Sequence, residues 1–352
     1  MRDVARIAGV STMTVSRVLA QPDLVAEATR RRVLEAVDKL GYVPDLIASG
    51  LSSKKSGFIA AVLPTLNNIN FAETAGGLTD TLRAVGFQLL IGYTNYRLKE
   101  EEALVRALLA RRPEGIVLTG SHHSRETRQL LLAADIPVIQ IWDLPSQPLG
   151  YAVGFSNFEV GRAMTLRLIE RGYRRIAFLG PSGDQPGFKD FRGDARLAGH
   201  VSALQQAGLD RDLVIRHGSG PVSFTHGAEA LGVLLDTHQD VDAVFGVSDL
   251  SAVGAAMECH RRGIKVPDDL AIAGFGDFEI GAQIVPSLTT VRIDCAGIGR
   301  RTGELLLDLL AKRHALAEGG QETIDVGFEL IERQSTRRPA GSTNTLEKVA
   351  TH

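Results

Sequence analysis

Four side chains near the amino-terminus have types and spacings suited to contacting the edges of base pairs. Thr12, Met13, Ser16 and Arg17 lie within STMTVSRVL at intervals that place them on one face of a helix. Arginine can pair with guanine, hydroxyls can bond to bases or phosphates, and methionine can contact the methyl group of thymine. This combination predicts a helix that enters the major groove of duplex DNA.

Three short helices must hold this face in place. Gly9 is expected to end the first helix and Ser11 to cap the start of the second. A third helix is predicted over Glu27–Leu40. The residues expected to face inward are Val4, Ala5 and Ala8, then Val15, Val18 and Leu19, then Val33, Leu34, Val37 and Leu40. Residues 1–41 therefore predict a helix-turn-helix, with a helical hairpin packed on the rest of the chain as the alternative.

The distribution of charge agrees with this interpretation. Residues 1–55 contain nine Lys and Arg against six Asp and Glu, a net charge of +3, whereas the remainder carries 30 against 35, or −5. A small basic segment on an acidic body suits contact with phosphate. A basic solvated surface would show the same excess.

The composition indicates a soluble globular protein of two to three domains. The 352 residues are 44% hydrophobic and 23% charged, which is enough apolar material for sizeable cores. No apolar run approaches the length of about 18 residues of a membrane span, and the amino-terminus lacks a signal-peptide core. We therefore expect a cytoplasmic protein, in which Cys259 and Cys295 are buried free thiols.

Residues 58–336 alternate between apolar strands and amphipathic helices. Strands are expected at 58–64, 87–93, 115–120, 137–141, 175–180, 242–247 and 270–275, and helices at 71–85, 158–171, 196–207, 250–262 and 296–312. Such alternation predicts parallel sheets covered by helices on both faces. The fold class is therefore a small all-α head plus an α/β body of two doubly wound lobes. We expect residues 42–57 to form a linker and the polar residues 337–352 to form a disordered tail.

Ligands of such sheets bind beyond the carboxyl ends of the strands. The residues at those ends that we expect to bind a ligand are Asn70, Phe71, Asp143, Phe155, Arg192, Arg196, Ser248 and Asp277. An arginine at the start of a helix needs an anionic partner, which favours a ligand role for Arg192 over a simple surface position. Phe71 could be core or an aromatic wall for a sugar.

The sequence resembles the lactose-repressor/galactose-repressor (LacI/GalR) family. The matching motifs are DVARIAGVSTMTVSRVL, TRRRVLEAVDKLGYVP, Leu51 and IAAVLP, and the order of motifs is kept over residues 2–336. The resemblance implies that Thr12, Met13 and Arg17 contact bases. It implies that Ser11, Thr14, Ser16 and Tyr42 contact the DNA backbone, and that Leu51 wedges into the minor groove. It also implies a homodimer on a palindromic operator, a hinge at 42–57 and an effector cleft between the lobes.

The chain departs from the family pattern in several places. The family has several residues before the position of Asp3, so the first helix is expected to be short by nearly a turn. Ala26 replaces a capping serine, at a cost of about 1 kcal/mol. Ser49 and Gly50 replace Arg-Ser in the hinge, which weakens its helix and removes a phosphate contact. Each change is expected to weaken DNA affinity without changing its class.

A further departure concerns the effector. Gly276 stands where many relatives have an Asp that accepts hydrogen bonds from a neutral ligand. Because the chain keeps Arg192 but lacks that carboxylate, an anionic ligand is favoured. The neighbouring Asp277 could restore the negative charge. AVGFSNFE at 152–159 and VGAAMECHRRGIKVPDDLAIAGF at 253–275 resemble the gluconate-utilisation repressors. The favoured effector is gluconate or a related keto-sugar acid, which we expect to release the protein from its operator. The alternatives are another sugar, or an effector that instead promotes DNA binding.

Two other classes of function have less support in the sequence. Phosphate-loop, dinucleotide and nucleophile-elbow motifs are not found in the sequence, and the adjacent His122 and His123 diverge on any regular element. We therefore expect no enzyme, cofactor or metal. A sugar-binding transport component would share the two-lobed body, but it would have no use for residues 2–41.

Overall fold

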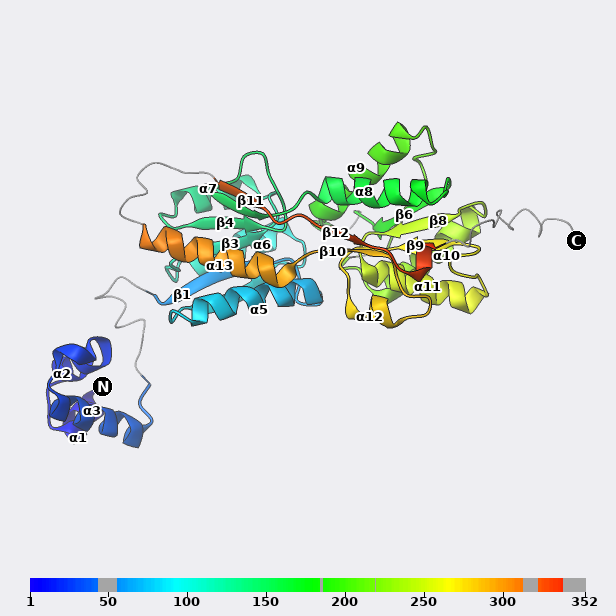
Figure 1. Cartoon of the computed structure of the whole chain (residues 1–352). Coiled ribbons are helices and arrows are strands. Elements are labelled where there is room, and N and C mark those ends of the chain that lie inside the picture. Colours follow the sequence, from blue (N-terminus) through cyan, green and yellow to red (C-terminus); the bar gives the residue numbers. More distant parts are fainter. Residues whose placement is uncertain (44–55, 184–185, 219, 313–321, 338–352) are drawn as a thin grey trace, which may run out of the picture. The chain divides into compact units, whose positions relative to one another are not determined.

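The computed structural model describes residues 1–43, 56–183, 186–218, 220–312 and 322–337. The chain divides into two compact units, residues 1–57 and 58–352 (Figure 1). Below, the first unit is called the head and the second the body. The positions of the linker departures Ser49 and Gly50 and of Leu51 lie outside the described residues, as does the tail from residue 338. The predictions made for them stay predictions.

In its described residues, 1–43 and 56–57, the head has three α-helices and a short 3-10 turn. They are α1 (Arg2–Ala8), α2 (Thr12–Ala20), η1 (Pro22–Leu24) and α3 (Glu27–Leu40). Gly9 ends α1 with a left-handed φ of 63°, and the Oγ of Ser11 caps α2 by accepting a hydrogen bond from the N–H of Thr14 at 3.1 Å. Ala26 begins α3 without a side-chain cap. These three expectations are confirmed.

The inward face of α3 differs from the prediction. Val33 and Ala36 are buried, but Leu34 and Leu40 are 44% and 42% exposed, so the prediction that both face inward was wrong. Leu34 lies about 100° around the helix from Val33, and Leu40 ends α3 one turn beyond Ala36. The small side chain of Ala36 instead lets α3 approach the other helices, in a core with Val4, Val15 and Val18.

The lobe that contains the first strand of the body, the N-lobe, is built on a six-stranded parallel sheet. Its strand order is β11-β5-β4-β3-β1-β2. The elements are β1 (Phe58–Leu63), β2 (Gln88–Tyr93), β3 (Ile116–Thr119), β4 (Val138–Ile141), β5 (Tyr151–Gly154) and β11 (Glu322–Asp325), with α5 (Ile69–Arg83), α6 (Leu98–Leu109), α7 (Arg125–Ala133) and α13 (Cys295–Ala311). Alternate residues of β1 face opposite layers: Ile59 packs in the core shared with α5 and α13, and Ala60 in the core shared with α6 and α7.

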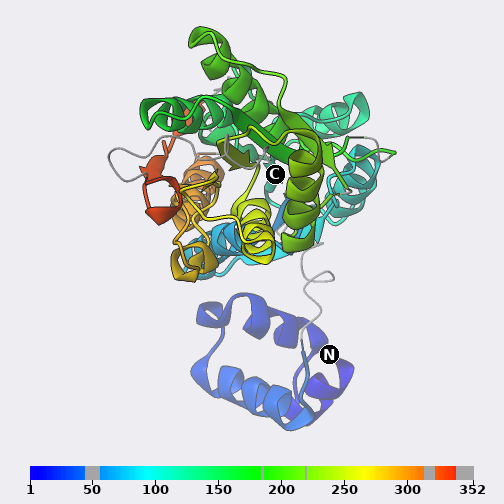
Figure 2. The ribbon, with the colours of Figure 1, turned by 90° about the vertical axis from the view of Figure 1, so that its right-hand side faces the viewer.

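The other lobe, the C-lobe, has a four-stranded parallel sheet in the order β7-β6-β8-β9. Its elements are β6 (Ile176–Pro181), β7 (Val214–His217), β8 (Ala243–Gly246) and β9 (Ala271–Ala273), with α8 (Asn157–Glu170), α9 (Phe191–Gln206), α10 (Phe224–Thr237), α11 (Asp249–Arg262) and α12 (Glu279–Gln283). Figure 2, which has the C-lobe toward the reader, shows α8 and α9 in green on one side of this lobe. Phe178 of β6 packs in the same core as Ile59 of β1. Leu179 packs in a separate core that includes residues of α10 and α11.

The chain passes between the lobes three times in its described part. It does so after β5, between β9 and α13, and after β11. On the second and third passages β10 (Thr290–Arg292) and β12 (Glu329–Ile331) pair antiparallel, and Figure 1 shows them between the two lobes. The last described element, η2 (Gln334–Thr336), follows β12.

The predicted fold class of the body is confirmed, with more elements than the sequence analysis named. All seven expected strands are present, whereas β5, β7, β10, β11 and β12 were not among them. The helix expected from Arg196 starts at Phe191, so Arg192 lies in its first turn. Cys259 and Cys295 are buried free thiols, as expected, and burial raises the pKa of each to about 12. Among the helices of the described residues, none has the length and apolar character to cross a membrane.

Candidate functional site

The outward face of α2 displays the side chains that the sequence analysis selected. Thr12, Met13 and Arg17 are exposed, Met13 by 72%, whereas Val15 and Val18 on the opposite face are buried in the head core. Ser16 is half-buried. The face that could enter a DNA groove is therefore also the face that the head leaves free.

Hydrogen bonding separates the polar side chains of α2 into two groups. The hydroxyls of Ser11 and Thr14 lie 2.9 Å apart and bond to each other, so part of their capacity is used in capping the helix. The guanidinium group of Arg17 has no hydrogen bond or ion pair to any other described residue. Tyr42 is half-buried and packs against the head core. Arg17 is thus the most available donor on this face.

Arg32 of α3 is a structural residue that the sequence analysis missed. Its Nε donates to the carbonyl of Ala8 at 3.1 Å, and its Nη2 donates to the carbonyl of Gly9 at 3.2 Å. These carbonyls end α1, where the helix dipole favours a cation. Arg32 therefore ties α3 to the turn between α1 and α2 and fixes the angle of that turn. In the sequence it belongs to the run Arg30-Arg31-Arg32, of which only Arg32 bonds to the end of α1.

Replacing Arg32 with alanine is expected to destabilise the head by about 2 kcal/mol, because charge-assisted hydrogen bonds to the α1 carbonyls are lost. Hydrogen exchange of the full-length protein should show amides of α1 exchanging about 30-fold faster. Arg31→Ala is the matched control, since Arg31 is exposed and lies 3.7 Å from Glu35 on its own helix. Equal exchange in the two variants would show that Arg32 does not hold the turn.

The body contains a cavity between its lobes at the carboxyl ends of the parallel strands. It encloses about 430 Å³ of unfilled space, counted with its opening. Its walls come from both lobes: Asn68, Asn70, Phe71, Tyr96 and Trp142 from the N-lobe, and Asp190, Arg192, Arg196, Val222, Val247, Ser248 and Phe275 from the C-lobe. This is the position at which doubly wound sheets bind ligands.

Two arginines of α9 dominate the polar wall of this cavity. Arg192 lies over the rings of Phe71 and Tyr96, at 5.5 Å and 5.9 Å from their centroids. Arg196 is buried over the ring of Phe275 at 4.2 Å, and its Nη1 donates to Asn157. The aromatic faces hold both guanidinium groups by cation–π contact and leave their N–H edges for polar partners.

Two buried polar atoms at the cavity have no hydrogen-bond partner among the described residues. They are the Nε of Arg196 and the Oγ of Ser248. Buried donors are rarely left unpaired, because the lost hydration costs about 1–3 kcal/mol for each group. Both atoms belong to cavity-lining residues, so a ligand that accepts hydrogen bonds would satisfy them.

Burial sets the ionisation of the cavity. It lowers the pKa of Arg196 to about 10, which still leaves the guanidinium charged at neutral pH. Burial, with the charge of Asp190, raises the pKa of Tyr96 to about 12, so its hydroxyl stays protonated and can donate. Asp249 follows Ser248 in the chain, and burial raises the pKa of its carboxyl group to about 7. This carboxyl group accepts hydrogen bonds from the N–H of Phe278 and from the hydroxyl of Thr290.

Five of the eight predicted ligand-binding residues line this cavity: Asn70, Phe71, Arg192, Arg196 and Ser248. Asp143 lines an adjoining chamber, where its carboxylate accepts a hydrogen bond from Ser121. Tyr96 and Asp190 were missed. The end-of-strand rule could have found Tyr96, because it follows β2. Asp190 is the N-cap of α9, and its side chain accepts a hydrogen bond from the N–H of Gly193, so an aspartate just before a helix was its signal.

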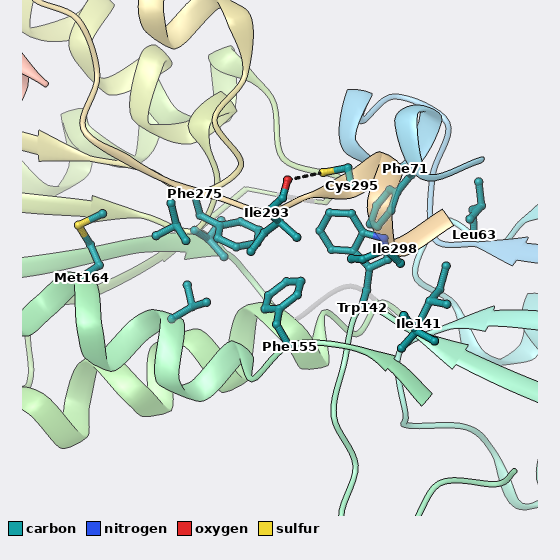
Figure 3. Packing of buried hydrophobic residues seen from close by; sticks show 14 of the residues in the cluster. Leu63, Phe71, Ile141, Trp142, Phe155, Met164, Phe275, Ile293, Cys295 and Ile298 are labelled. Atoms are coloured by element: carbon teal, nitrogen blue, oxygen red, sulfur yellow. Dashed lines mark hydrogen bonds between the residues drawn. The ribbon is translucent and has the colours of Figure 1, made fainter. Parts of the chain in front are cut away.

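Phe155 and Asp277 do not line the cavity as predicted. Phe155 is fully buried in the passage between the lobes, with its ring centroid 5.6 Å from that of Trp142 and 6.0 Å from that of Phe275 (Figure 3). Asp277 is held by Arg292 and Arg333, each at 2.6 Å. Both residues follow strands, but packing turns one into the core and ion pairing turns the other away.

Gly276 leaves no room for a side chain. Its φ is 128°, and a Cβ there would lie 2.6 Å from the ring of Phe278 and 3.0 Å from the amide nitrogen of Asn70. The ring of Phe278 therefore excludes an aspartate at this position. Since Asp277 is paired with two arginines, it does not replace the missing carboxylate.

The lobes contact each other at the edge of the cavity. The N–H of Lys189 donates to the carbonyl of Tyr96 at 2.9 Å, and the rings of Tyr96 and Phe188 lie 5.3 Å apart. His122 stacks on Phe191 at 4.5 Å. The cavity and the adjoining chamber that contains Asp143 share Tyr96, Asp190 and Arg192 as wall residues.

The adjacent histidines have separate structural partners. His122 takes part in the lobe contact, while the buried His123 bonds to Glu101 at 2.9 Å and to Gln140 at 3.0 Å. Within the described ranges, no group of three or more His, Cys, Asp or Glu side chains is arranged to hold a metal ion.

Each of the two units matches a known protein family. Residues 1–45 match the profile of bacterial regulatory proteins of the lacI family, and residues 165–336 match that of a periplasmic binding protein-like domain. The HTH-type transcriptional regulator GntR of Pseudomonas aeruginosa is 39% identical over 96% of this chain and 95% of its own. A LacI family regulator from Silicibacter pomeroyi superposes with a TM-score of 0.87 at 32% identity, over 96% of this chain and 99% of that one.

A third comparison involves a protein with a bound sugar. The structure of a complex of the transcriptional regulator CelR with cellobiose is 30% identical, with a TM-score of 0.67, and the match covers 95% of this chain and 98% of that one. The identities and coverage exceed what a shared fold alone would produce. The chain belongs to the lacI family of bacterial regulatory proteins, and it is a DNA-binding transcriptional regulator rather than an enzyme.

Proposed function

We propose that the protein is a homodimeric repressor of sugar-acid utilisation genes, and that gluconate or a related keto-sugar acid in the inter-lobe cavity releases it from its operator. In this proposal the bases are contacted by Thr12, Met13 and Arg17. The DNA backbone is contacted by Ser11, Thr14, Ser16 and Tyr42, and Leu51 inserts between bases in the minor groove. Residues 1–41 bind the operator, 42–57 form the hinge and 58–336 respond to the effector. Regulators of this family meet DNA in the cytoplasm, which is where we place the protein.

The unpaired guanidinium N–H of Arg196 is the observation that carries the effector class. Two arginines and one aspartate, Asp190, are the charged residues of the described cavity wall. The carboxylate that would favour a neutral sugar is sterically excluded at Gly276, and Asp277 is neutralised by its two arginines. A carboxylate ligand would satisfy the Nε of Arg196 and gain from the net positive charge. Its hydroxyls would reach Ser248, Asn70 and Asp190.

Exposed apolar side chains support the homodimer. β2 is an edge strand of the N-lobe sheet, yet its Leu90, Ile91 and Tyr93 are 40%, 40% and 52% exposed. An edge strand of this kind is a template for association with another chain unless it is protected. A dimer also suits a palindromic operator, because one head buries too little surface for strong specificity.

Calorimetry with matched ligands tests the effector class. We expect gluconate and ketogluconates to bind at least tenfold more tightly than glucose or gluconamide, which offer similar hydroxyls without the charge. The same acids should lower the affinity of full-length protein for an operator selected from random duplexes. Equal affinity for gluconate and gluconamide, or operator binding unaffected by every acid in the panel, would contradict the proposal.

A further inference from the structure

Asn157 occupies an unusual position between the lobes. It is the first residue of α8, directly after the passage from β5, and it is 1% exposed. Its Oδ1 accepts a hydrogen bond from Nη1 of Arg196 in the C-lobe. Its Nδ2 donates to the backbone carbonyl of Trp142 in the N-lobe at 3.0 Å. One amide group therefore bonds to a cavity residue of each lobe.

The partners of Asn157 are themselves held in place. The indole Nε1 of Trp142 donates to Thr74 of α5 at 3.1 Å, and Thr74 donates to the carbonyl of Asn70 at 2.8 Å. Asn70 and Trp142 both line the cavity. A continuous set of polar contacts thus runs from Arg196 through Asn157 and Trp142 to the first turns of α5.

Aromatic packing follows the same route. The rings of Phe71 and Trp142 meet edge to face at 5.0 Å, and Phe155 continues the row to Phe275, over which Arg196 lies (Figure 3). Aromatic contacts tolerate small changes of angle, whereas a hydrogen bond weakens steeply when its geometry is lost. The two bonds of Asn157 are therefore the directional part of this lobe-to-lobe connection.

We propose that Asn157 is a positioning residue that couples occupancy of the cavity to the relative orientation of the two lobes; this inference rests on the proposed function. The amide makes both bonds only when Arg196 and Trp142 keep their present separation. A ligand that engages Arg196 changes the energy of that arrangement. Asn157 passes the change to Trp142 and α5, so that the arrangement of lobes preferred with ligand differs from the one preferred without it.

Asn157→Asp separates the two bonds. Aspartate keeps an oxygen that accepts from Arg196, but it places a second oxygen against the carbonyl of Trp142, where the amide had a donor. Gluconate affinity should fall, because the new carboxylate offsets the charge of Arg196, so operator affinity with ligand is measured at saturating gluconate. The ratio of operator affinities without and with gluconate, which is commonly about 5–150 in coupled systems, should fall below about threefold. Asn157→Ala should lower both the ratio and the gluconate affinity.

Trp142 provides a direct signal because it is the single tryptophan of the chain. Its fluorescence monitors ligand binding in the cavity and confirms that each variant is folded. Arg162→Met on the exposed side of α8 is the matched control, since Arg162 bonds to Glu159 and Gln206 and not to a cavity residue. The control should keep the wild-type ratio. A wild-type ratio in Asn157→Asp would overturn the proposal.

A ligand-independent measurement separates this inference from the proposed function. If no sugar acid releases wild-type protein from its operator, the proposed effector class fails. Asn157→Asp should nevertheless shift the Trp142 emission in the unliganded protein and change its small-angle scattering profile, because the lobes lose a directional bond. Unchanged emission and scattering would refute the role of Asn157 whatever the effector is.

Discussion

Arg17→Ala is expected to abolish the preference of the full-length protein for its operator. A good contact between an arginine and a base pair contributes about 1–3 kcal/mol of discrimination, and a dimer makes it twice. The loss should therefore be about 30-fold or more in specific affinity, while binding to a scrambled duplex changes little. Competition binding with the two duplexes at one fixed salt concentration measures both quantities.

The structure explains why Arg17 should have the largest effect in the head. It is exposed and unpaired among the described residues, whereas the hydroxyls of Ser11 and Thr14 bond to each other at the start of α2. Arg31→Ala is the control, because it removes an exposed charge from α3 rather than α2. It should weaken binding to both duplexes alike. Retained selectivity in Arg17→Ala, or loss of gluconate binding, would refute the assignment of the recognition face.

Arg196→Met is expected to weaken gluconate binding by about 100-fold or more. Methionine fills much of the space over Phe275 but removes the charge and the unpaired Nε. Losing a buried, hydrogen-bonded charge pair with a ligand costs about 2–5 kcal/mol. Operator affinity in the absence of ligand should fall less than gluconate affinity, although the variant also removes the donor to Asn157. Calorimetry gives the first quantity and duplex binding the second.

A second variant tests whether Arg192 also contributes to gluconate affinity. Arg192→Ala should weaken gluconate binding less than Arg196→Met, because Arg192 is half-buried and leans on the rings of Phe71 and Tyr96. Gluconate affinity that stays at the wild-type level in both variants would remove the α9 arginines from the site. Loss of operator binding in either would point to a defect of the whole body instead.

The arrangement of elements was largely predictable from the sequence. Apolar runs that alternate with amphipathic stretches specify parallel strands and covering helices, because each strand must bury both faces and each helix one. Gly9 and Ser11 specify the ends of helices through local backbone geometry and capping. The exposed face of α2 followed from the same periodicity. Short strands such as β10 and β12 could not be predicted, since their pairing depends on chain segments far apart in sequence.

The candidate site was predictable only to the level of loops. The rule that ligands lie beyond strand ends selected Arg192, Arg196 and Ser248, which line the cavity, but also Phe155 and Asp277, which do not. A side chain that follows a strand can point into the cavity, into the core or toward an ion-pair partner. Sequence spacing does not distinguish these directions, because they depend on the neighbours that the fold brings together.

The sequence by itself determined the helix-turn-helix, the two-lobed body and the family, since these depend on periodicity and on local motifs. The tertiary structure alone decided that Arg32 holds the turn of the head, that the ring of Phe278 excludes a side chain at Gly276, and that Asn157 bonds to both lobes at once. Each of these features depends on distances between residues far apart in the chain, and such distances exist only after the chain has packed.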